Sequence, residues 1–264
     1  MGDPTVNRLQ ELASFIKLLD LACSSESRVL VIEEASGRGK SRLIQRFKEV
    51  CYERAAALSS VDLVGGSLSP IDILKRMAHD LEDIRFERCW NVLNKRGVAN
   101  LQVGIEGNKI LGSATLNVDS PVYVERATRE EQKQFWSDAA QEFQQDLREC
   151  RRVDSRAIVM FFDTYEKAAP ESQAWICDHL LPAVAPKRVA GLLIVVAGKS
   201  CPRPSGEWED QCQSLALHSL KKEDWVQYAT LVGSMITEEQ IQMLYDKHEG
   251  ATLKMAEAVG LFIP

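Results

Sequence analysis

The strongest chemical signal in this sequence is a glycine-containing loop early in the chain. Residues 36–41, SGRGKS, follow a short apolar run and precede a helical pattern. Glycines let backbone N–H groups converge on phosphate oxygens, a lysine neutralises them, and a hydroxyl can bind a magnesium ion. The segment therefore predicts a phosphate-binding loop. In the full pattern GxxxxGK[ST] the first glycine falls at position 34, where this chain has Glu34, so an ordinary polar loop remains the alternative.

Two acidic residues and a lysine follow other strand-like segments. The run 157–163, AIVMFFD, ends on Asp163, and Glu166 comes three residues later. A carboxylate at the end of a buried strand can hold a magnesium ion through water, and a second can polarise an attacking water. Lys199 follows the run 191–198 and would contact the terminal phosphate if that strand lies between the loop strand and the strand that ends on Asp163. The alternatives are a helix cap for Asp163, a solvated loop acid for Glu166 and a surface lysine for Lys199.

Alternating strands and helices are expected to position these residues. Apolar or β-branched runs predict strands at 29–32, 61–64, 157–163, 191–198 and 215–217. Apolar residues at helical spacing predict helices at about 5–23, 43–51, 69–81, 128–147 and from Pro170 to just before Pro182. Continuous apolar strands joined by helices are typical of a parallel sheet with right-handed crossovers. The pattern indicates an α/β fold with a five-stranded parallel sheet.

Local signals refine this picture. Ser69, Thr128 and Thr237 each stand where a side chain can cap a helix N-terminus. Alternating apolar residues at about 98–119 predict a β-hairpin inserted into the α/β domain. Everything after about residue 219 is expected to be helical, with Gly250 as a helix stop, and to pack on the α/β part.

Composition excludes several classes of protein. The 264 residues include 32 Lys and Arg against 38 Asp and Glu, a formal charge of −6, which argues against long-range attraction to nucleic acid or to an anionic membrane and leaves only a local basic patch as an alternative. The 7 cysteines are scattered and never spaced as CxxC, which favours reduced thiols in the cytoplasm over disulfides or a zinc site. No stretch approaches the length of a membrane span, and the first residues lack the apolar core of a signal peptide.

In chain order, these segments resemble the STAND class of P-loop NTPases, which are AAA+ relatives that act as nucleotide-dependent signalling switches. The resemblance rests on Asn7-Arg8 before an amphipathic helix, the loop 36–41, FDTYE at 162–166, Ala-Gly-Lys at 197–199 and LxxLKKEDW at 217–225. It covers essentially the whole chain. It implies a P-loop NTPase three-layer sandwich with AAA+-like strand order and a small helical lid, which binds ATP or ADP with Mg²⁺.

The resemblance also implies roles for individual residues. Arg8 is expected beside the nucleotide, Asp163 as the Walker B aspartate, and Lys199 in place of the sensor-1 arginine. Lys40 would hold the β- and γ-phosphates, and Glu166 the attacking water. The candidate site residues are Glu166 and Lys199 for catalysis; Arg8, Ser36, Gly37, Arg38, Gly39, Lys40 and Ser41 for nucleotide binding; and Ser41 and Asp163 for the metal.

Three positions depart from the family pattern: Glu34 replaces the first loop glycine, Lys199 replaces arginine, and Gly250-Ala251-Thr252 replaces Gly-x-Pro. They affect the polar site more than the buried residues on which the fold depends. Two functions therefore stay open. One is an ATP-Mg²⁺ switch with slow hydrolysis at most, and the other is a non-hydrolysing scaffold for protein–protein interaction. A small-molecule kinase is less favoured, because no substrate-lid motif is evident.

The expected organisation has two parts. Residues 1–218 would form the NTPase domain, with its N-terminal helix and the hairpin at about 98–119, and residues 219–264 a small helical subdomain. The effector or repeat modules usual in the resembling family do not occur in these 264 residues. Other protein modules or chains, or further copies of this chain, are therefore the expected partners.

Overall fold

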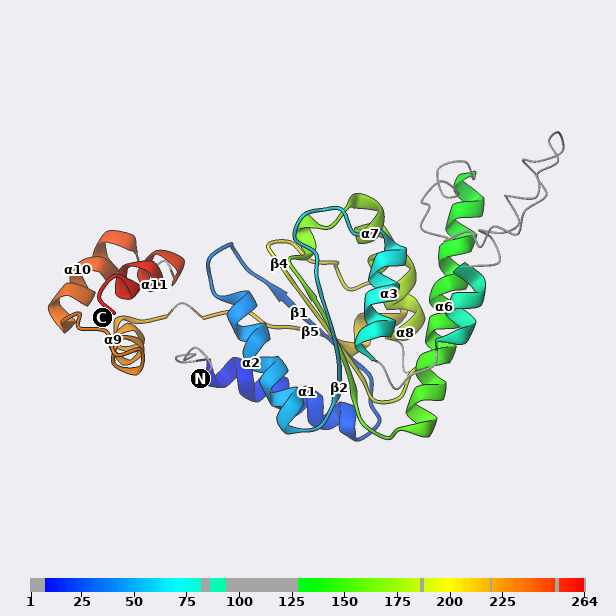
Figure 1. Ribbon diagram of the computed structural model, residues 1–264, viewed down its shortest axis with the longest axis horizontal. Coiled ribbons are helices and arrows are strands. Elements are labelled where there is room, and N and C mark those ends of the chain that lie inside the picture. The colour runs from blue at the N-terminus through cyan, green and yellow to red at the C-terminus, as the bar shows by residue number, and fades with distance from the viewer. Residues whose placement is uncertain are drawn as a thin grey trace, which may run out of the picture.

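A five-stranded, all-parallel sheet forms the centre of the computed structural model, which describes residues 8–81, 86–93, 128–185, 188–218, 220–249 and 252–263 (Figure 1). The strand order is β2-β3-β4-β1-β5. The strands are β1 (Arg28–Glu33), β2 (Ala57–Asp62), β3 (Ile158–Asp163), β4 (Leu192–Gly198) and β5 (Cys212–Ser214). The predicted α/β fold with a five-stranded parallel sheet is confirmed.

Helices cover both faces of the sheet, so the molecule has three layers (Figure 1). Successive residues of a strand point to opposite faces. Leu30 and Ile32 of β1 accordingly join one buried cluster with α1 (Leu9–Cys23) and α2 (Lys40–Glu53). Val29 and Val31 join the other, with α3 (Pro70–Asp80), α6 (Arg129–Val153), α7 (Pro170–Trp175) and α8 (Leu181–Val184). Burial on both faces explains why β4 is apolar along its whole length.

The capping signals predicted from the sequence are confirmed. Ser69, Thr128 and Thr237 each accept a hydrogen bond from the backbone N–H three residues on, and the side chain there bonds back to the cap residue. These reciprocal bonds fix the starts of α3, α6 and α10 (Glu238–His248). The predicted inward face of α6 is also correct, since Trp136, Ala140, Phe143 and Leu147 are buried.

Two strand boundaries differ from the prediction, and both belong to edge strands. β2 covers Ala57–Asp62 rather than 61–64. Its first half is polar, and Asp80 accepts hydrogen bonds from the hydroxyl of Ser59 and the N–H of Ser60. The last strand is β5 rather than 215–217. Its residues are polar and partly exposed, so hydrophobicity does not reveal it.

The helix after Pro170 also differs from the prediction, because it does not stop before Pro182. A π-helical segment, Ile176–Leu180, follows α7, and α8 then contains the proline. A proline lacks the N–H that an α-helix uses and crowds the carbonyl four residues earlier. The wider i→i+5 turn of the π segment relieves this conflict, so the helix continues to Val184.

Three C-terminal helices share a buried cluster of their own. α9 (Lys222–Leu231), α10 and α11 (Thr252–Gly260) pack around Trp225, Ile241 and Met255. They form a group beyond the loop end of β1 (Figure 1). The predicted hairpin at 98–119 and the predicted helix stop at Gly250 lie outside the described residues. Within the described part of the chain, no helix combines the length and apolar character needed to cross a membrane.

Candidate functional site: the loop after the first strand

The predicted phosphate loop connects the end of β1 to the start of α2. Gly37 has φ +79° and Gly39 has φ +86°, in the left-handed region that favours glycine. A side chain at Gly37 would in addition lie 3.2 Å from Cβ of Leu253 in α11. Gly39 is the N-cap residue of α2. The loop therefore meets the N-terminal end of a helix, where unpaired N–H groups and the helix dipole favour an anion.

Lys40 is the first residue of α2, and its ammonium lies back over the loop. It donates hydrogen bonds to the carbonyl oxygens of Glu34 and Ala35, the latter at 2.9 Å. Because an ammonium is a flexible point charge with three donors, phosphate oxygens can replace these carbonyls as its partners. The positive charge of Lys40 therefore lies at the loop, and its side chain is not part of any buried cluster.

Ser41 and Asp163 are brought together from different elements. Asp163 ends β3, and its carboxylate accepts a hydrogen bond from the N–H of Thr164 at 2.8 Å. The Ser41 side chain lies near enough to this carboxylate to lower its pKa. Burial raises the pKa of Asp163, and the nearby charge of Asp62 adds to this, against the opposing effect of the hydrogen bonds and of Lys48. Asp62 lies directly opposite on β2.

This pair of oxygen groups fits a magnesium ion. Mg²⁺ is usually held by one or two protein oxygens together with phosphate oxygens and water. Among the described residues, no group of three or more His, Cys, Asp or Glu side chains is arranged to hold a metal by itself. A site at Ser41 and Asp163 would therefore be completed by a phosphate ligand.

Glu166 also lies close to Lys199, but its carboxylate contacts the backbone N–H of Lys199 and not the lysine side chain. Glu166 follows a turn in which Thr164 has φ +59°, and its Oε2 accepts the N–H of Lys199 at 2.8 Å. A side chain at Gly198 would lie 2.8 Å from the same oxygen. β4 lies between β1 and β3, the arrangement required for Lys199 to stand beside the loop. The Lys199 side chain itself is exposed.

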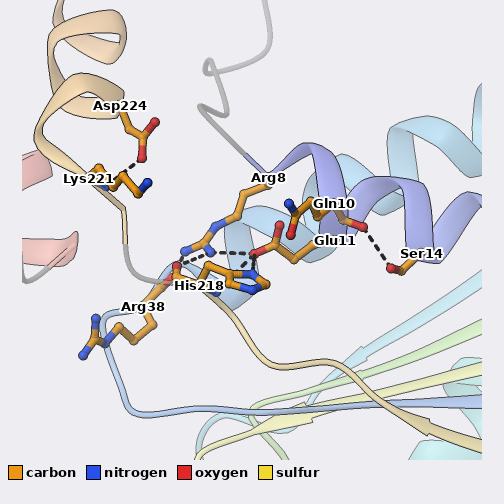
Figure 2. A network of polar contacts seen from close by, with 8 residues as sticks. All are labelled: Arg8, Gln10, Glu11, Ser14, Arg38, His218, Lys221 and Asp224. Atoms are coloured by element: carbon orange, nitrogen blue, oxygen red, sulfur yellow. Dashed lines mark hydrogen bonds and ion pairs between the residues drawn. The ribbon is translucent and has the colours of Figure 1, made fainter.

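Arg8 occupies a buried position at the start of α1 and contacts three segments (Figure 2). Its Nη1 donates to Oε1 of Glu11 at 2.8 Å and to the carbonyl of His218 at 2.6 Å, and its Nη2 donates to the carbonyl of Arg38 at 3.0 Å. Burial raises the pKa of Glu11, but hydrogen bonds from backbone groups and Arg8, together with the Arg8 charge, outweigh burial and hold it below its ordinary value.

Several contacts at the loop were not predicted from the sequence. Cγ2 of Thr252 in α11 lies 3.8 Å from the point a Gly39 side chain would occupy, and its hydroxyl is buried without a hydrogen-bond partner among the described residues. Arg42 of α2 lies over the ring of Tyr228 in α9, 5.6 Å from its centre. Glu11 and the backbone of His218 accept hydrogen bonds from Arg8. Spacing reveals only one of these contacts, since Arg8 and Glu11 lie three residues apart on a helix.

Comparisons with known proteins identify the fold. The sequence matches no family model and no curated protein sequence. The structure is similar to Cdc6p from Pyrobaculum aerophilum, with a TM-score of 0.55, 15% identity and coverage of 97% of this chain and 61% of that one. It is also similar to a STAND protein with a tetratricopeptide repeat sensor from Pyrococcus horikoshii, with a TM-score of 0.50, 16% identity and coverage of 96% and 30%. The chain thus has an AAA+/P-loop NTPase-like fold and spans less than two thirds of either protein.

Proposed function

We propose that this chain binds ATP with Mg²⁺ at the loop 36–41 and acts as a nucleotide-dependent signalling switch of the STAND kind, with slow hydrolysis at most. The observation that carries the proposal is that the side chain of Ser41, beside the loop lysine, lies close to the carboxylate of Asp163 at the end of β3. A lysine, a hydroxyl and a carboxylate at one loop are the groups that phosphoryl chemistry with magnesium requires.

Each polar residue has a task in this proposal. The N–H groups of the loop and the ammonium of Lys40 bind the phosphates, Ser41 is a ligand of the magnesium ion, and Asp163 holds one of its water ligands. The ion, when bound, neutralises charge on the phosphates. Glu166 orients the attacking water, and Lys199 approaches the terminal phosphate. Residues 219–264 form the part that responds to nucleotide, and other protein chains or further copies in the cytoplasm read the response.

A second function, a scaffold that does not hydrolyse nucleotide, is favoured by two contacts. The carboxylate of Glu34 turns back onto the loop and accepts the N–H of Ala35 at 2.9 Å. The carboxylate of Glu166 is held by the N–H of Lys199. Each bond ties the carboxylate to the backbone and so restricts where its remaining oxygen can meet a water molecule. The two functions differ in whether ATP binds at all and in whether it turns over.

Removing the charge of Glu34 is expected to strengthen ATP binding about tenfold. A carboxylate about 6 Å from a phosphate at an effective dielectric of about 20 costs roughly 2–3 kcal/mol before magnesium and Lys40 screen it. Glu34→Gly removes both the charge and the side chain, whereas Glu34→Gln keeps an oxygen for the N–H of Ala35. Calorimetric titration with Mg-ATP should show both variants binding more tightly, and Glu53→Gln, at the far end of α2, binding like the wild type. Equal affinity in all four proteins would show that the charge does not oppose ATP.

Glu166→Gln is expected to leave ATP affinity within about twofold and to lower turnover by roughly a hundredfold, because an amide cannot take a proton from water. The amide oxygen can still accept the N–H of Lys199, so the strand end stays in place. Release of phosphate in a single-turnover assay measures the effect, with Glu171→Gln, an exposed acid of α7, as the control. Unchanged turnover would remove Glu166 from the reaction.

A further inference from the structure

The guanidinium of Arg8 joins three segments that are far apart in the sequence. Its partners belong to α1 (Glu11), to the phosphate loop (Arg38) and to the segment 215–218 between β5 and α9 (His218) (Figure 2). Arg8 is 6% exposed and Glu11 is 2% exposed. A buried pair of charges that is hydrogen-bonded on several sides has one stable geometry, because leaving either charge unpaired is costly.

The contact with the loop fixes the direction of a peptide group. In a trans peptide the C=O of one residue and the N–H of the next point in opposite directions. Because Arg8 holds the carbonyl of Arg38, the N–H of Gly39 points away from Arg8. Gly39 is the N-cap of α2, at the centre of the region expected to bind phosphate. Arg8 therefore orients one of the loop's donors in advance.

The second contact fixes the segment that leads to the helical group. Arg8 holds the C=O of His218, and Oε1 of Glu11 accepts the N–H of the same residue at 3.3 Å. Both backbone polar groups of His218 are thus bound by the Arg8–Glu11 pair. Three residues further, Lys221 starts α9 through a capping bond with Asp224 at 2.6 Å (Figure 2).

We infer that Arg8 is a positioning residue that couples the phosphate loop to helices α9–α11 and is not itself a ligand of the nucleotide. The coupling between loop and helices stands on the contacts above, and its effect on ATP rests on the proposed function. These contacts use three of the five N–H donors of the guanidinium, and Arg8 is only 6% exposed, which argues against a nucleotide atom as a further partner.

The test compares the position of the helical group in matched variants. Spin labels are attached at Cys23, which is exposed on α1, and at Met243→Cys, which is exposed on α10, and the distance between them is measured without nucleotide. Arg8→Lys keeps the charge beside Glu11, but a single ammonium cannot span all three oxygens. We expect a narrow distance distribution in the wild type and a broad one in Arg8→Lys. Arg54→Lys, which alters an exposed pair with Asp20, should remain narrow.

Mg-ATP affinity is measured on the same proteins. Arg8→Lys is expected to bind about tenfold more weakly than the wild type, with a melting temperature within a few degrees of it. Glu11→Gln, which keeps an oxygen acceptor for Arg8 but removes the charge, gives a second variant if Arg8→Lys folds poorly, and it should broaden the distances as well. A narrow distribution in both variants would overturn the inference, and so would weaker ATP binding with unchanged distances, since that is the behaviour of a direct ligand. If the wild type binds no ATP, the proposed function fails, while the distances still decide the coupling.

Discussion

Lys40→Ala is expected to abolish ATP binding, with a loss of roughly a hundredfold or more in affinity, and to leave the melting temperature within about 2 °C of the wild type. The ammonium of Lys40 donates only to two carbonyls of its own loop, so its removal leaves no buried charge without a partner. The loss falls on the phosphates, because Lys40 is the first residue of α2 and its ammonium lies over the loop.

A fluorescent ATP analogue titrated against both proteins, together with their melting curves, measures this effect. Lys17→Ala is the matched control, because Lys17 is an exposed lysine on α1. Its affinity and its melting temperature should both match the wild type. Equal affinity in Lys40→Ala and the wild type would remove the assignment of the phosphate loop.

Asp163→Asn is expected to remove the magnesium dependence of ATP binding and to raise the melting temperature of the free protein by a few degrees. Burial raises the pKa of Asp163, and the charge of Asp62 adds to that rise. The folded state therefore binds a proton at Asp163 more readily than the unfolded state. At neutral pH the ionised carboxylate reduces the stability of the folded state, and an uncharged amide relieves this cost.

The pH dependence of the melting temperature tests whether the charge of Asp163 destabilises the folded protein. As pH falls through the raised pKa of Asp163, the wild-type carboxyl becomes neutral and the difference in melting temperature from Asp163→Asn should shrink. Asp62→Asn is the control: it removes the neighbouring charge and should also stabilise the protein, but it should keep the magnesium dependence. If ATP binding by Asp163→Asn still depends on magnesium, and Asp163→Ala, which removes the acceptor for the N–H of Thr164, unfolds the protein, Asp163 is a structural cap.

The buried strands and the helix starts were predictable because their signals are local. β3 and β4 are continuous apolar runs, which only a sheet covered on both faces accommodates. The caps at Ser69, Thr128 and Thr237 depend on residues three apart in sequence. The edge strands were misplaced, since β5 pairs with one neighbour only and keeps polar residues at its exposed side.

The site was predictable only in part, because some of its signals are local in sequence and others are not. The loop residues are consecutive in sequence, and a carboxylate at the end of a parallel strand lies at the same edge of the sheet as the loop. Residue type and order therefore suggest both the loop and Asp163. The contacts of Arg8 join residues that lie 30 and 210 positions away in sequence. They use backbone carbonyls, which carry no residue-specific signal. No pattern of side chains could have indicated that Arg8 binds the loop and the segment 215–218 at once.

ATP binding at the loop is the central requirement of the proposed function, and calorimetric titration of the wild-type protein with ATP, with and without Mg²⁺, tests it most directly. We predict one site per chain, with a dissociation constant in the high-micromolar range or weaker because of Glu34, and binding that strengthens when Mg²⁺ is present. The absence of binding at millimolar Mg-ATP, both in the wild type and in Glu34→Gly, would contradict the account and leave the scaffold as the function of this fold.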